Sequence, residues 1–99
     1  MKEVIDLASH FSRLERMCTH PKEANHLEAL FRELKYFTER MADGASLELQ
    51  ELLGDIQIRV AMWEHVWPRL GGEGAFRNAV AREAHAWSNK LLKLSKHPS

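Results

Sequence analysis

The feature that most constrains this chain is a run of apolar residues between positions 49 and 70 that recur at alternating intervals of four and three. An α-helix turns once in about 3.6 residues, so this spacing places the whole run on one face of a helix. The run consists of Leu49, Leu53, Ile56, Val60, Trp63, Trp67 and Leu70. It predicts a long amphipathic helix, and Pro68 is expected to tighten or kink its last turn because proline donates no backbone hydrogen bond.

Three other segments repeat this spacing. Their apolar positions are Val4, Leu7, Phe11, Leu14 and Cys18, then Leu27, Leu30, Leu34, Phe37 and Met41, and finally Phe76, Val80, Ala84, Trp87, Leu91 and Leu94. No segment shows the strict alternation of a half-buried strand. Short joints between long helices favour antiparallel neighbours. We therefore predict an all-α fold, an antiparallel bundle of about four helices over 2–18, 21–42, 47–69 and 75–95, which dimerisation could complete.

The joints between these segments carry recognisable helix ends. Pro21 suits the first turn of a helix, with Thr19 or His20 as the cap. The Asp43-Gly44 pair indicates a helix stop, and Ser46 is a favoured N-cap for the next helix. The glycines between 71 and 74 form the most flexible joint. The acid-before-base pairs Glu28–Arg32 and Asp55–Arg59 have the spacing of ion pairs within a helix.

Composition bounds the class of protein. The chain has 99 residues with 14 basic and 14 acidic side chains, which indicates a single domain over 1–99 with one modest core. Stability from so small a core is marginal, and a partner would add to it. Zero net charge argues against general binding to nucleic acid or to membrane surfaces. A single cysteine excludes an intrachain disulfide, and the sequence contains no signal peptide or membrane-spanning run, so we expect a cytoplasmic protein.

The charges nevertheless separate along the chain. Formal charge is about −1 over 1–43, −3 over 44–64 and +4 over 65–99. The third helix also carries apolar residues outside its core-facing run, namely Ile58, Met62 and Val66. Either this helix is central and packed by all the others, or these residues meet a second protein. Methionine adapts to varied surfaces and is enriched at interfaces.

No complete catalytic or metal-binding set of residues occurs, so we expect no enzyme activity, cofactor or metal. Cys18 lies in an apolar run and is expected to be a buried small hydrophobe, although nearby Arg16 and His20 would favour a reactive thiol. We predict a non-enzymatic interaction module, a regulator, inhibitor or adaptor that binds another protein and forms a homodimer. Its predicted interface is Ile58, Met62, His65 and Val66.

Two alternatives remain open. Arg59 and His65 have five residues between them, a spacing similar to that of the HEPN ribonucleases, in which an arginine and a histidine act across a dimer. That resemblance implies RNA cleavage by acid–base chemistry. Arg82, Lys90 and Lys93 fall roughly along one face of the fourth helix and could contact a nucleic acid, or equally an acidic protein surface.

Overall fold

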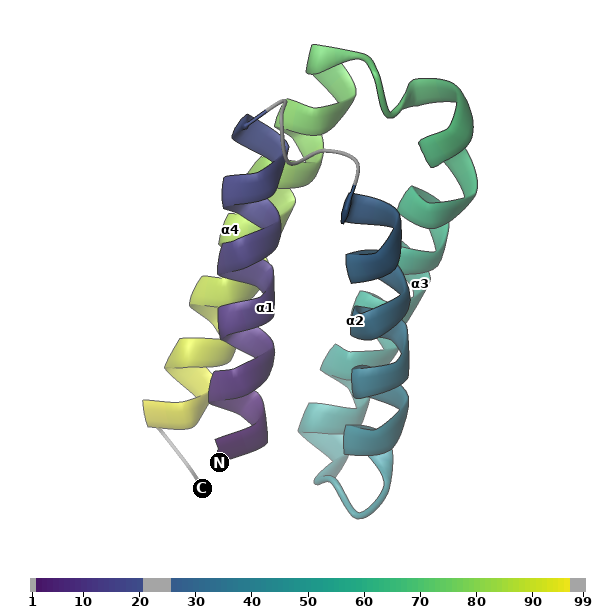
Figure 1. The fold of residues 1–99 in the computed structure, drawn as a ribbon. Coiled ribbons are helices and arrows are strands. Elements are labelled where there is room, and N and C mark those ends of the chain that lie inside the picture. The colour runs from purple at the N-terminus through teal and green to yellow at the C-terminus, as the bar shows by residue number, and fades with distance from the viewer. Residues whose placement is uncertain (1, 21–25, 97–99) are drawn as a thin grey trace.

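The computed structural model describes residues 2–20 and 26–96, and this part of the chain contains four helices and no strand. The helices are α1 (Lys2–Thr19), α2 (Leu27–Ala42), α3 (Leu47–Leu70) and α4 (Gly74–Lys96). They alternate in direction along the long axis of the molecule (Figure 1). The predicted all-α antiparallel bundle is thus confirmed.

The helix boundaries agree with three of the four predicted segments to within one residue. Thr19 is the last residue of α1 and therefore does not cap the next helix. The predicted start of the second helix at Pro21 falls within 21–25, outside the described residues. The α2 helix begins at Leu27 after His26, whose side chain makes no capping hydrogen bond.

The turn between α2 and α3 follows the sequence closely. Gly44 has a φ of 76°, a backbone conformation in which a side chain would be strained, so glycine is required there. Ser46 then caps α3, because its side chain accepts a hydrogen bond from the Leu49 amide at 3.3 Å. Pro68 lies inside α3, which nevertheless continues to Leu70.

The core is built from the predicted apolar faces. All five predicted positions of α1 are buried, and so are Leu53, Ile56, Val60 and Trp63 of α3. Trp67 is partly buried at the edge of this core. Phe31 is fully buried and packs against Trp63 and Trp67 with ring centroids 6.0 and 5.8 Å apart. Phe31 lies one position beyond Leu30 and falls outside the predicted run of apolar residues in this segment, so that run does not predict its burial.

The four helices are grouped in two close pairs. α1 packs along α4 and α2 packs along α3, whereas α3 and α4 approach each other at few positions (Figure 1). Ring contacts connect the pairs: the His10 ring of α1 lies 5.3 Å from that of Phe37 of α2, and the Trp67 ring of α3 lies 6.3 Å from that of Phe76 of α4, measured between centroids. The molecule is elongated, with extents of 41 × 21 × 17 Å.

The ion pairs connect different helices. Among the described residues they are Arg13–Glu33 between α1 and α2, Lys35–Glu64 between α2 and α3, Arg59–Glu83 between α3 and α4, and Glu15–His85 between α1 and α4. The expected pairs within a helix, Glu28–Arg32 and Asp55–Arg59, are not among them. Asp55 does not pair with Arg59 because the Arg59 guanidinium contacts Glu83 of α4 instead.

Candidate functional site

Near its middle, the outward side of α3 exposes two large apolar side chains one turn apart, and Leu47, 72% exposed, lies on the same side at the start of the helix. Ile58 is 73% exposed and Met62 is 44% exposed. His65 is exposed on the next turn, and Val66 is half-buried. One interpretation of the apolar residues outside the core-facing run was that α3 is a central helix enclosed by all the others. That interpretation is wrong for Ile58 and Met62. We call these two residues the Ile58–Met62 patch.

A polar network fixes α3 to α4 beside this patch. Trp63 is buried, and its indole N–H donates a hydrogen bond of 3.0 Å to Glu83 Oε2. The other carboxylate oxygen, Oε1, lies 3.4 Å from Nε of Arg59. A guanidinium nitrogen of Arg59 in turn lies 4.0 Å from the sulfur of Met62. The network connects α3 to α4 directly beside the patch.

The predicted basic face of α4 lies opposite acidic residues. Lys90 and Lys93 line a groove of about 450 Å³, and the α3 side of this groove carries Glu48, Glu51 and Asp55. Nζ of Lys90 also lies 4.9 Å from the centroid of the Trp87 ring. Arg82 is exposed on α4 and does not line the groove. The groove thus carries charges of both signs, and its lysines are not part of a purely cationic surface.

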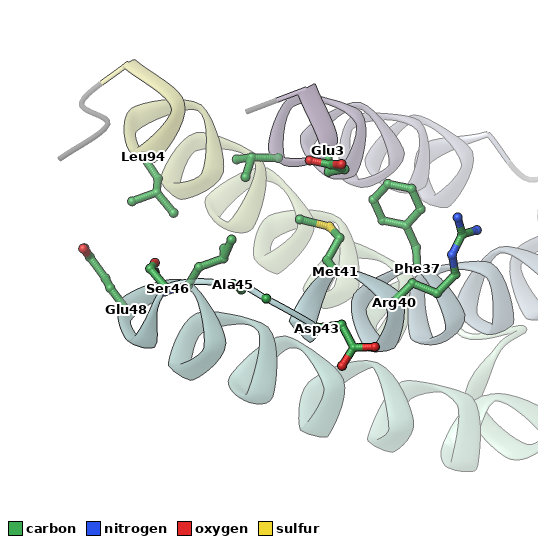
Figure 2. A pocket seen from close by; sticks show the side chains of 12 residues that line it. Glu3, Phe37, Arg40, Met41, Asp43, Ala45, Ser46, Glu48 and Leu94 are labelled. Atoms are coloured by element: carbon green, nitrogen blue, oxygen red, sulfur yellow. Dashed lines mark hydrogen bonds between the residues drawn. The ribbon is translucent and has the colours of Figure 1, made fainter.

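A second pocket of about 590 Å³ opens at the end of the bundle that holds the α2–α3 turn. Figure 2 shows Phe37 and Met41 projecting from α2 toward α1, with Leu94 of α4 opposite the turn. Glu3, Asp43 and Glu48 are exposed acidic residues at its rim. In the described part of the chain, no three His, Cys, Asp or Glu side chains lie close enough to hold a metal ion.

The side chains that could act in catalysis do not come together in one site within a single copy of the chain. Arg59 is paired with Glu83, whereas His65 lies exposed on the outward side of α3. Cys18 is buried, as expected for a small hydrophobe. Burial raises the pKa of its thiol to about 11, and the Arg77 guanidinium only partly offsets this effect. The thiol therefore stays protonated at neutral pH, which is unfavourable for a nucleophile.

Comparisons with protein-family models, with curated proteins and with solved structures give no match. Among the helices of the described residues, none combines the length and the apolar character needed to cross a bilayer. The surface chemistry of this chain is therefore the basis for assigning it a function.

Proposed function

We propose that this protein is a small helical interaction module that acts by binding another protein, and that it forms a homodimer through the outward side of α3. It has no enzymatic activity of its own in this proposal. Its role is that of a regulator, inhibitor or adaptor in the cytoplasm. Ile58 and Met62 supply the apolar centre of the contact, with His65 and Val66 beside them.

The exposure of the Ile58–Met62 patch carries this proposal. Among the described residues, Ile58 has the largest exposed fraction of the large apolar side chains, 73%, followed by Leu47 at 72%. Helix-mediated recognition uses apolar side chains that lie one turn apart on an exposed helix face, as Ile58 and Met62 do. The fully buried side of α3 already supplies the core through Leu53, Ile56 and Val60, so the fold itself does not require Ile58 or Met62 to be apolar.

The test is the oligomeric state of the wild-type chain and of Met62→Asp, measured by size-exclusion chromatography with light scattering. We expect a wild-type dimer and a monomeric variant, because dimerisation would bury two uncompensated carboxylates, one from each copy. The expected weakening is about 100-fold or more in the dissociation constant.

The matched control is Ile5→Asp, because Ile5 on α1 has a nearly equal exposed fraction, 47% against 44% for Met62. The control should remain dimeric, and circular dichroism should show the same helix content in all three proteins. A wild type that is monomeric at every concentration tested would contradict the proposal, and so would equal weakening by both substitutions.

A further inference from the structure

The outward side of α3 carries a second set of residues at alternating intervals of four and three. In chain order they are Glu51, Asp55, Ile58, Met62, His65 and Arg69, and all six are exposed. We call this set the α3 outer face. Its spacing is that of the contact positions in a two-helix coiled coil, here on the side of the helix opposite the core. The face could therefore pack along another helix over about five turns.

The order of charges along this face is antisymmetric. The two acidic residues come first, the two apolar residues lie in the middle, and the basic residue and the histidine come last. Each residue has a counterpart at the same distance on the other side of position 60. Glu51 corresponds to Arg69, Asp55 to His65, and Ile58 to Met62.

This symmetry determines how two copies would pair. In an antiparallel pair centred on position 60, the Ile58 of each copy meets the Met62 of the other, and each Glu51 meets an Arg69. A parallel pair would instead place Glu51 against Glu51 and Arg69 against Arg69, which is repulsive at both ends. Charge complementarity therefore favours a second copy of this chain in one orientation.

The remaining charges near the face are compatible with this arrangement. Within the described residues, no ion pair engages Glu51, Asp55, His65 or Arg69, so all four are available to a partner. Lys90 and Lys93 line the neighbouring groove with Glu51 and Asp55, but none of these side chains forms an ion pair across it. Arg59, the other cation of α3, is held by Glu83.

We infer that two copies of this chain associate through antiparallel α3 outer faces centred on position 60, with Ile58 against Met62 and Glu51 against Arg69. This inference rests on the proposed function and adds the identity of the partner, the orientation and the register. The apolar centre supplies the affinity, and the charged ends select the antiparallel arrangement.

A charge exchange between Glu51→Arg and Arg69→Glu tests the register. Each variant alone places like charges at both ends of its dimer, and we expect a dissociation constant about tenfold weaker for each. An equimolar mixture restores both pairs. In each heterodimer the introduced arginine of one copy faces the introduced glutamate of the other, and the native Arg69 of the first copy faces the native Glu51 of the second. The mixture should therefore dimerise at least as well as the wild type in sedimentation velocity.

The matched control for the charge change is Glu39→Arg, which alters an exposed acidic residue of α2 outside the α3 outer face. We expect its dimerisation alone to equal that of the wild type. A mixture of Glu39→Arg with Arg69→Glu should dimerise no better than Arg69→Glu does alone. The mixture of Glu51→Arg with Arg69→Glu, in contrast, should dimerise more strongly than either of its components. The antiparallel register is overturned if the mixture of Glu51→Arg with Arg69→Glu fails to recover. It is overturned equally if each variant alone dimerises as well as the wild type, which is the result that a parallel pair would give.

Cysteine cross-linking tests the orientation. Ile58→Cys and Met62→Cys are made separately, one of them with a mass tag, and oxidised alone and mixed. The antiparallel register predicts that the mixed disulfide forms fastest, since position 58 faces position 62. Native Cys18 can stay in place because it is buried, and the wild type serves as the uncross-linked control.

The outcomes separate this inference from the proposed function. If the wild type is a dimer but the cysteine variants cross-link fastest between identical positions, the antiparallel register is overturned and the interaction module stands. A wild type that is monomeric in sedimentation velocity would overturn both. Preferential formation of the 58–62 disulfide, together with recovery in the charge exchange, supports the antiparallel dimer.

Discussion

Cys18 illustrates how the position of one residue decides its chemistry. It lies near the end of α1 and is 3% exposed, so its thiol is in contact with the core. Burial disfavours the thiolate and raises the pKa to about 11 from an ordinary value of 9.0, against the opposing effect of Arg77. The proton is thus held more tightly in the folded state than in the unfolded state.

This shift predicts a loss of stability at alkaline pH. Above pH 9 the unfolded thiol ionises while the folded thiol does not, so the free energy of unfolding falls until the pH reaches about 11. The contribution of this one group is about 1.4 kcal/mol for each pH unit in that window. Urea unfolding at a series of pH values should show a steeper decline for the wild type than for Cys18→Ala. Parallel curves would contradict this assignment.

Two glycines of the α3 region should respond to substitution in opposite directions. A Cβ at Gly54 would meet nothing within 4 Å, so Gly54→Ala should stabilise the helix by about 0.5–1 kcal/mol. A Cβ at Gly71 would lie 2.7 Å from ring atoms of Trp67, which is packed on Phe31, so Gly71→Ala should cost about 1–3 kcal/mol. Urea unfolding in the monomeric Met62→Asp background measures both. A change of the same sign in the two variants would contradict the prediction.

Among the elements, α3 has the most varied surroundings. One side forms the core, one contacts α2 through the Lys35–Glu64 ion pair, and one meets α4 through Glu83. Its remaining side is the α3 outer face. Because α3 and α4 approach each other at few positions, side chains join them: Glu83 contacts Trp63 and Arg59, and Trp67 packs against Phe76.

Glu83 variants should separate the hydrogen bond from the charge. Glu83→Ala leaves the buried Trp63 N–H without its acceptor, and we expect a loss of about 1–3 kcal/mol in the free energy of unfolding. Glu83→Gln keeps an acceptor oxygen and removes only a partly exposed ion pair, so its loss should be about 1 kcal/mol or less. Thermal unfolding of both variants provides the measurement. Equal losses would show that the charge, and not the indole hydrogen bond, is what Glu83 supplies.

At this scale the sequence predicts the helices well, because the local signals agree with the fold. Apolar spacing, the Ser46 cap and the Gly44 stop all act within a few residues, and each is confirmed. The contacts between helices could not be derived in this way. The rotamer that takes Arg59 to Glu83 instead of Asp55 depends on where α4 lies, and no local pattern contains that information.

The candidate site was predicted only in part. Ile58 and Met62 were identified as surplus apolar residues, but two interpretations remained open until their exposure was known. The charged ends of the α3 outer face were not identified, since Glu51 and Arg69 have no distinctive signal individually. Their role depends on which side of α3 faces outward, because that decides whether they lie on the same face as the Ile58–Met62 patch.

At the scale of the whole molecule, the bundle has its most extensive contact between its first and last helices. α1 packs along α4, and the side chains of Ser12 and Ser88 meet at 3.1 Å within this contact. Ser88 also donates a hydrogen bond to the Ala8 carbonyl at 3.2 Å. These contacts join residues more than 70 positions apart, whereas α2 and α3 are joined by a short turn.

This pairing has a consequence for how the protein is made. During synthesis α1 is translated before the other three helices, and α4, which packs along it, is translated after them. The α2–α3 hairpin can form as soon as its own residues emerge, but Leu7, Phe11 and Leu14 stay uncovered on the α4 side until about residue 91 has appeared. The contact between α1 and α4 therefore cannot form until α4 has been translated, so the four-helix core folds as a unit only after that point.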